Sequence, residues 1–262
     1  MQFTLMQMEF FLLIIVRTSG FFLFTPFFGS QDIPNSAKAM MAFLFALMIF
    51  PGVWNPNVPM PTDITDLTMA AFAELSIGIL MGFTTNLIFI GVQFAGFLIG
   101  HSMGLAMANV LDPFTETQVS LIAQVYFFLL LAIFIIIGGP DWFVLAIARS
   151  FEFIKPGGFV FSEMMAGYIA EKVGYMFTIG VMFAAPLVGS LFIVIVILGF
   201  LARTMPQMNV FVIGMPAQII TGIILLMIGL TGISMGFDRL LDTINGITIE
   251  LLDIMGEAAA HG

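Results

Sequence analysis

Long runs without a charged side chain dominate this sequence and limit what it can fold into. The stretch Ser76–Gly100 contains no Asp, Glu, Lys or Arg, and Val173–Leu201 is an apolar run of 29 residues. A helix of about 20 such residues is long enough to cross the hydrocarbon core of a bilayer. Only 9% of the chain is charged, whereas soluble domains have about 25%. The chain must therefore fold with lipid, or with equally apolar partner subunits, as its main surroundings.

The rest of the composition excludes several classes of function. The net charge is −9 with seven Lys and Arg, which argues against nucleic acid because that ligand needs clustered positive charge. The chain has no cysteine, and hence no disulfide, thiolate metal site or redox motif. Its two histidines, His101 and His261, lie too far apart in the sequence for a zinc-protease motif. No basic region precedes the first apolar run, so we interpret that run as retained rather than as a cleaved signal peptide.

Apolar runs alternate with breaks and predict an all-α, membrane-associated fold of five to seven helices. The runs are Phe10–Phe28, Ala37–Phe50, Ile64–Gly100, Val119–Gly138, Trp142–Ile154, Val173–Leu201 and Ile219–Phe237. The clearest breaks are Pro51–Pro61, through which we expect no helix to continue, and Gly138-Gly139-Pro140, Pro156-Gly157-Gly158 and the polar His101–Ser120. Because the runs are so uneven in length, we expect several helices to be kinked or buried in protein, with Pro186 at one kink. Val119–Gly138 is the cleanest spanning candidate.

Two charges and two pairs of glycines lie inside these runs. Arg17 should face protein or water, or extend to an interface, because a lone charge in the bilayer costs at least about 2.5 kcal/mol. Glu74 is interpreted as a charge near one helix end. Two GxxxG pairs, Gly78 with Gly82 and Gly96 with Gly100, predict close helix packing, since small residues four apart let backbones approach.

Two patterns resemble a catalytic or a metal site but have simpler interpretations, and a third pattern leaves two interpretations open. Gly100-His101-Ser102-Met103-Gly104 fits the G-x-S-x-G motif of serine hydrolases, but a long helical run precedes it instead of the required strand. The acidic segment Asp112–Glu116 has too few carboxylates to hold Ca²⁺ convincingly and is interpreted as a solvated connector. Gly199–Ala217 is either a plain helix reversal or a tip that contacts a partner.

The C-terminal segment Asp238–Gly256 is amphipathic at helical spacing. Its apolar positions are Leu241, Ile244, Ile247 (or Thr248), Leu251, Leu252 and Met255. The segment also carries four acids and one base. A single helical face is therefore expected to be apolar here.

Four segments of the chain resemble the FliR family of flagellar type III export proteins and its SctT-like injectisome relatives. They are Gly20–Pro34 (GFFLFTPFFGSQDIP), Met103–Pro113 (MGLAMANVLDP), Ala185-Pro186-Leu187 and Leu201–Pro216 (LARTMPQMNVFVIGMP). Four motifs in the family's order are far more specific than any one alone. The resemblance covers roughly residues 10–237, and the segment after Phe237 carries no information in this comparison.

The resemblance implies a core subunit of the export gate at the centre of the flagellar basal body, in the bacterial inner membrane. Residues 1–172 would be a FliP-like helical part, 173–237 a FliQ-like helical hairpin with its tip at 202–209, and 238–262 the amphipathic tail. The implied partners are FliP-like and FliQ-like subunits, an FlhB-like switch protein, the secreted flagellar proteins and membrane lipid. No enzymatic activity, cofactor or metal is expected. The alternative suggested by the residues alone is a stand-alone secondary transporter, which would need intramembrane acids, broken helices and two related halves.

Two groups of site residues follow from the resemblance. The loop 105–118 would plug the pore in its closed state through Leu105, Met107, Asn109, Asp112, Pro113 and Phe114. The hairpin tip would contact a partner through Arg203, Pro206, Gln207, Asn209, Phe211 and Gly214. In the plug-like segment, Phe114 and Glu116 depart from the family pattern.

Overall fold

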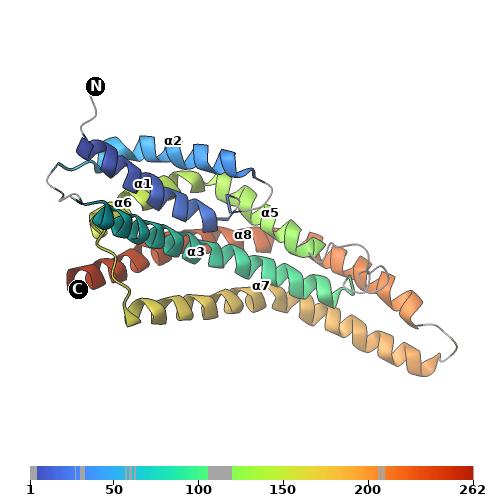
Figure 1. Ribbon diagram of the computed structural model, residues 1–262. Helices are drawn as coiled ribbons and strands as arrows, with labels where there is room; N and C mark the ends of the chain where they lie inside the picture. Colours follow the sequence, from blue (N-terminus) through green and yellow to red (C-terminus); the bar gives the residue numbers. More distant parts are fainter. Residues whose placement is uncertain are drawn as a thin grey trace. The chain divides into compact units, whose positions relative to one another are not determined.

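The computed structural model describes most of the chain, and its regular elements are helices. The described residues are 5–26, 28–29, 33–56, 58, 61, 63–105, 120–205, 207 and 210–261. Their helices are α1 (Leu5–Phe24), α2 (Asn35–Val53), α3 (Ile64–Ser102), α5 (Leu121–Ile136), α6 (Gly139–Phe153), α7 (Glu163–Thr204) and α8 (Val210–His261) (Figure 1). No strand occurs in these ranges. The prediction of an all-α protein is confirmed.

Several of the helices have the length and composition of membrane spans. Five of those in the described residues, α1, α2, α3, α7 and α8, are long and apolar enough to cross a bilayer. A sixth span results if the sharply bent pair α5 and α6 is counted as one. These numbers confirm the predicted membrane-associated protein with five to seven apolar helices.

Pro51 lies inside the last turn of α2, but the helix ends at Val53 and does not continue through the proline-rich connector, as the sequence predicts. The helix has 19 residues and continues to Val53. Proline cannot donate to the carbonyl four residues earlier, but in the last turn this removes one hydrogen bond without breaking the helix. The Trp54 amide then donates to the Phe50 carbonyl at 3.0 Å and closes the helix.

Gly138 separates α5 from α6, at the break that the sequence predicts. Its φ of +81° lies in the left-handed region, which costs a residue with a Cβ about 1–2 kcal/mol. The helix before it, α5, has only 16 residues. Alone it is shorter than the roughly 20 residues of an upright span, so the cleanest spanning candidate of the sequence is only one arm of a bent pair.

The two longest helices continue through prolines and through changes in polarity. α7 has 42 residues and includes Pro186, while α8 has 52 residues and continues into the amphipathic C-terminal segment. All the apolar-face positions of that segment are buried, namely Leu241, Ile244, Ile247, Thr248, Leu251, Leu252 and Met255. Its apolar face is therefore used for packing. The kink at Pro186 and the division at 172 and 237 stay predictions.

The described chain forms two compact units. The first comprises Met1–Leu87, Phe134–Val173 and Leu241–Gly262, and the second comprises Ile88–Ile133 and Gly174–Leu240. Aromatic rings fill the core of the first unit, where Phe10 packs on Trp54 at 5.2 Å between centroids and on Phe151 at 6.1 Å. The second unit contains the neighbouring parts of α7 and α8, where Phe183 packs on Phe237 at 5.2 Å.

Candidate functional site

The first pair of predicted packing glycines lies where α3 crosses α1 in the first unit. A Cβ added at Gly78 would overlap the backbone of Arg17, and one added at Gly82 would overlap the backbone of Phe21. From the other side, a Cβ at Gly20 would come within 2.7 Å of the Leu75 carbonyl oxygen. The two helices are thus in backbone contact, the geometry that small residues permit in membrane proteins.

The second pair lies where α3 meets the start of α5 in the second unit. A Cβ at Gly96 would come within 2.5 Å of the Cα of Ala123, and one at Gly100 within 2.5 Å of the Ser120 hydroxyl oxygen. All four glycines of the two GxxxG pairs therefore occupy positions at which a side chain would force neighbouring atoms apart.

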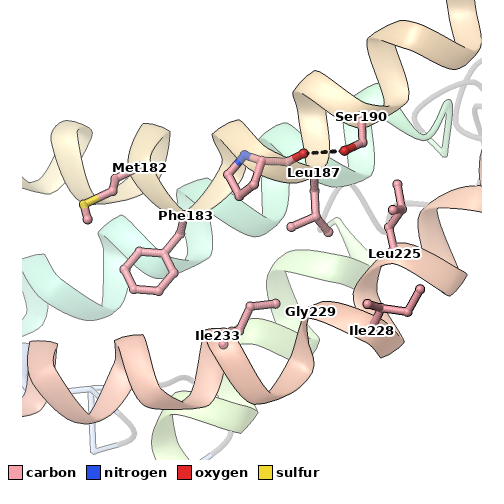
Figure 2. Close-up of a pocket in the computed structure, with 10 residues that line it drawn as sticks. Met182, Phe183, Leu187, Ser190, Leu225, Ile228, Gly229 and Ile233 are labelled. Carbon is pink, nitrogen blue, oxygen red and sulfur yellow. Dashed lines mark hydrogen bonds between the residues drawn. The ribbon is translucent and has the colours of Figure 1, made fainter.

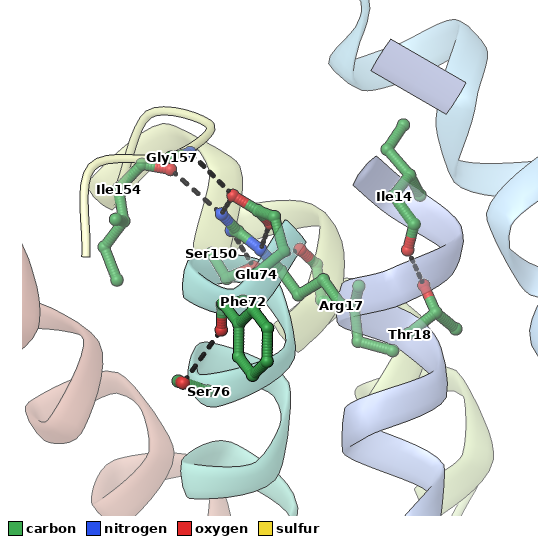
Figure 3. A network of polar contacts seen from close by, with 10 residues as sticks. Ile14, Arg17, Thr18, Phe72, Glu74, Ser76, Ser150, Ile154 and Gly157 are labelled. Atoms are coloured by element: carbon green, nitrogen blue, oxygen red, sulfur yellow. Dashed lines mark hydrogen bonds and ion pairs between the residues drawn. The ribbon is translucent and has the colours of Figure 1, made fainter. Parts of the chain in front are cut away.

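A buried ion pair lies beside the first crossing. Arg17 and Glu74 are both 0% exposed, and the Arg17 Nη2 group donates to a Glu74 oxygen at 3.0 Å while Nε donates to the other carboxylate oxygen. The guanidinium also donates to the Ser150 hydroxyl at 2.8 Å and to the Ile154 carbonyl at 3.3 Å. The Gly157 amide donates to Glu74 at 2.9 Å, so both charges are surrounded by hydrogen-bonding partners (Figure 3).

This cluster ties three helices of the first unit together. Arg17 belongs to α1 and Glu74 to α3, while Ser150 and the loop residues Ile154 and Gly157 come from α6 and the segment that follows it. The guanidinium carbon also lies 3.7 Å from the centroid of the buried Phe151 ring, a cation–π contact. Truncating one partner of such a buried pair typically costs about 3–5 kcal/mol, because the other charge is left buried and unpaired.

The sequence alone does not predict that Arg17 and Glu74 form a pair, although each is a charged residue in an otherwise apolar run. Arg17 faces protein, one of the alternatives considered for it, but Glu74 is fully buried rather than a charge at a helix end. The two residues are 57 positions apart, so helical periodicity cannot bring them together. The available signal was that each lies in an otherwise apolar run, and opposite charges in such runs tend to pair.

A second polar contact links α7 with α8 in the first unit. The Tyr168 hydroxyl oxygen lies 2.8 Å from the Ile247 carbonyl oxygen and 3.0 Å from a Glu250 carboxylate oxygen. Lys172 lies 3.3 Å from the same carboxylate. These contacts fix the two helices next to each other near the start of α7 and the end of α8.

The part of the α7–α8 pair in the second unit exposes an unusual amount of apolar surface. Only 17% of the most apolar stretch of α7 and 11% of that of α8 are buried, against 61% for α3. The exposed side chains on α7 and directly after it include Phe177, Val181, Met182, Phe192, Ile193, Ile197, Phe200 and Met205, and those on α8 include Val212, Ile220, Ile224, Met227, Ile228 and Met235. We call this surface the exposed hairpin face.

A cavity of about 360 Å³ lies between the two helices on this part of the hairpin. Phe183 and Leu187 of α7 and Ile233 of α8 point toward one another around it (Figure 2). Its lining is apolar except for Ser190, whose hydroxyl donates to the Pro186 carbonyl at 2.8 Å. Because this hydroxyl is already hydrogen-bonded within α7, the cavity offers a ligand apolar contacts but no free polar group.

The predicted tip residues are only partly described. Arg203 is exposed at the end of α7, Gln207 is exposed in the turn, and Gly214 is buried on α8. Phe211 belongs to the first turn of α8, but its side chain, together with Pro206 and Asn209, lies outside the described residues. The partner-contact role of the tip stays a prediction.

Leu105, the first residue of the predicted plug, is the last described residue before the gap at 106–119. Leu105 follows Gly104, whose φ is +78°. Met107, Asn109, Asp112, Pro113 and Phe114 lie outside the described residues, as does the acidic segment Asp112–Glu116. The plug assignment also stays a prediction.

The serine of the G-x-S-x-G pattern lies at the end of a helix. Ser102 is the last residue of α3, and its hydroxyl donates to the Leu98 carbonyl at 2.8 Å. The neighbouring His101 ring stacks on Phe97. The strand-to-helix turn that exposes a hydrolase nucleophile has no counterpart in the residues before Ser102, since α3 is helical from Ile64.

Comparison with known proteins gives one consistent family. A model of bacterial export proteins, family 1, matches residues 8–244 of the chain. The flagellar biosynthetic protein FliR of Bacillus subtilis (strain 168) is 34% identical over 221 residues, which cover 83% of this chain and 85% of that protein. The FliR proteins of Aquifex aeolicus (strain VF5) and Escherichia coli (strain K12) are 32% and 28% identical, over 80% and 77% of this chain and 81% and 76% of their own lengths.

Proposed function

Because this chain belongs to the FliR family of bacterial export proteins and is thus a membrane component of the flagellar export apparatus, we propose that it is a core subunit of the export gate. In this role it forms part of the pore through which unfolded flagellar proteins leave the cell. It lies at the centre of the basal body in the inner membrane, beside FliP-like and FliQ-like subunits. Its hairpin tip contacts an FlhB-like switch protein.

The observation that carries the proposal is the length of the exposed hairpin face. Exposed apolar side chains on α7 and directly after it extend from Phe177 to Met205, a distance of about 42 Å at 1.5 Å per residue. The hydrocarbon core of a bilayer is only about 30 Å thick. Lipid alone would cover this face only if the helix tilted by about 45°, beyond the usual range of up to about 40°. Partner subunits that cover part of it remove the mismatch.

Co-expression tests the proposed assembly. The chain is produced with an affinity tag, alone and together with the FliP-like and FliQ-like proteins of the same organism. We expect a low yield of aggregating protein when it is alone, because the exposed hairpin face lacks its cover, and a stable hetero-oligomer when the partners are present. A monodisperse monomer or homodimer whose yield does not respond to the partners would contradict the proposal.

We further propose that the loop 105–118 closes the pore and leaves its lumen during export. Deletion of Asn109–Thr115 should leave the hetero-oligomer intact and make the closed complex leak ions in planar bilayers. Deletion of Gln7, at the start of α1, provides a control outside the loop. If the loop deletion conducts no more than the intact complex, this loop does not seal the pore.

Two features support this role over the alternatives of transport and catalysis. A secondary transporter needs an intramembrane acid that can bind and release its ion, whereas Glu74 is fully buried and already bonded to Arg17 and to the Gly157 amide. A hydrolase needs an activated serine, whereas the Ser102 hydroxyl donates back to its own helix. We therefore expect Ser102→Ala to leave flagellar export unchanged, and a loss of export with intact assembly would contradict this.

A further inference from the structure

A second cavity, of about 290 Å³, lies in the first unit and belongs to none of the sites above. It is lined by Phe10, Gly52, Val53, Asn55, Val58, Phe151, Glu152, Lys155 and Pro156. These residues come from the start of α1, the ends of α2 and α6, and the segments that follow those two helices. Its volume is close to the lower limit of small-ligand sites, about 300 Å³.

The inner wall of this cavity is aromatic. Phe10 and Phe151 are 1% and 9% exposed, and their ring centroids lie 6.1 Å apart. Trp54, directly after α2, packs edge-on against Phe10. Tryptophan is enriched at the level of lipid head groups, where its ring meets apolar and polar surroundings at once. Trp54 does not line the cavity but packs on its wall, and a tryptophan at this place fits a location at a bilayer interface.

The rim of the cavity carries one acid and one base. Glu152 and Lys155 are both exposed, and neither takes part in an ion pair within the described residues. On a continuous helix, residues three apart would be neighbours. Here α6 ends at Phe153, and Ile154 is extended with φ −129° and ψ 111°. The chain thus presents two opposite charges at one cavity without pairing them.

An exposed apolar face leads along α2 to the same cavity. Met40, Phe43, Leu44, Leu47 and Met48 are 46–62% exposed, and only 17% of the apolar stretch of α2 is buried. This helix ends at Val53, which lines the cavity together with Gly52. In the first unit, the start of α1 and the end of α2 lie side by side (Figure 1). Apolar surface is therefore continuous with a cavity that has charges at its rim.

We propose that this cavity binds the head group of a zwitterionic phospholipid, phosphatidylethanolamine, whose acyl chains lie along the exposed face of α2. The Lys155 ammonium contacts the lipid phosphate, and the Glu152 carboxylate contacts the lipid ammonium group. A net-neutral head group, with one phosphate and one ammonium, matches the one base and one acid at the rim. The proposal needs only the membrane location of the chain and not its role in the export gate.

Lipid retention by the purified full chain, in complex with its co-expressed partners, tests the site. The complex in detergent is titrated with dioleoylphosphatidylethanolamine or dioleoylphosphatidylglycerol, and bound lipid is measured by native mass spectrometry. We expect a preference for phosphatidylethanolamine that falls about three- to fivefold in Lys155→Glu and in Glu152→Lys, as expected for loss of a partly exposed ion pair. The double variant with both charges exchanged should restore the preference.

A matched control and two outcomes make the test decisive. Arg149→Glu changes an exposed charge on the same helix outside the cavity and should leave the lipid preference unchanged. Equal loss in Arg149→Glu and Lys155→Glu would overturn the proposal, because it would show a general charge effect. A photo-cross-linker at Val58 that captures a protein subunit instead of lipid would also overturn it, since the cavity would then be a protein interface.

Discussion

Removal of either member of the buried ion pair should strongly destabilise the first unit. Glu74→Leu leaves the Arg17 guanidinium, which is 0% exposed, without its carboxylate partner. It also leaves the Gly157 amide without its acceptor. Breaking a buried pair in this way costs about 3–5 kcal/mol. At about 2–4 °C per kcal/mol for a chain near this size, the midpoint of thermal unfolding should fall by about 6–20 °C.

Tryptophan fluorescence of the purified complex, with any tryptophan of the partner subunits replaced, measures this change selectively. The chain has only two tryptophans, Trp54 and Trp142, and both belong to the first unit. Wild type, Glu74→Leu, Arg17→Met and the double variant are compared in the same detergent. Glu171→Gln serves as the control, because its bond to Lys172 is at the surface with Glu171 71% exposed and such pairs contribute at most about 1 kcal/mol.

The double variant decides whether loss of the ion pair causes the destabilisation seen in the single variants. Replacing both partners of a buried pair by apolar residues is often neutral or even stabilising. Here the Ser150 hydroxyl keeps its bond to the Ile147 carbonyl, and the Gly157 amide is the main group left unsatisfied. The double variant should therefore be more stable than either single variant. If its unfolding midpoint lies below both, the two charges do not act as a pair and the reasoning is refuted.

Three further substitutions test other contacts by the same measurement. Gly78→Ala should destabilise by about 1–3 kcal/mol because its methyl would overlap the Arg17 backbone, whereas Gly167→Ala, which lies in the same unit and meets nothing within 4 Å, should be neutral or stabilising by up to about 1 kcal/mol; equal effects would refute the close crossing. Gly138→Ala should cost about 1–2 kcal/mol because its φ is +81°, and an unchanged midpoint would argue against the left-handed turn. Tyr168→Phe should cost about 1 kcal/mol through loss of the bond to the Ile247 carbonyl, and a stabilised variant would show that this bond is not formed.

The sequence predicts the helices well because apolar length and helix breakers are local properties. Gly138 ends α5 where the sequence indicates, and the spacing of Leu241, Ile244 and Leu251 marks a buried face of α8. α2 continues for three residues beyond the apolar run Ala37–Phe50 and includes Pro51. A proline excludes a helix only where the missing hydrogen bond and the ring clash fall in the interior, and the sequence does not say which turn is the last.

Side-chain partners across the fold could not be predicted in the same way. Arg17 and Glu74 each stood out as charges in apolar runs, but nothing in either run specifies the other as its partner. Packing of α1 against α3 through Gly78 brings them together. The pairing is therefore a consequence of tertiary structure.

The functional assignment follows from family membership and not from the physical properties of the helices. The length of the exposed apolar surface on α7 and α8 favours a cover by protein as well as lipid, but apolar side chains alone do not identify which protein covers them. The four motifs of the sequence, and the relatives matched over most of the chain, identify the export apparatus. The residues proposed to plug the pore, except Leu105, lie outside the described part of the chain, so their role rests on that family alone.

Site-specific photo-cross-linking from the exposed hairpin face tests the central claim most directly. A cross-linking amino acid replaces Phe192 of α7 or Met227 of α8, which are 62% and 73% exposed, and in the control it replaces Leu187, which is 6% exposed. In cells that assemble flagella, the two exposed positions should cross-link to FliP-like or FliQ-like subunits, while the control should not. Cross-links from both exposed positions to lipid alone, or only to a second copy of this chain, would contradict the claim that partner subunits of the export gate cover this face.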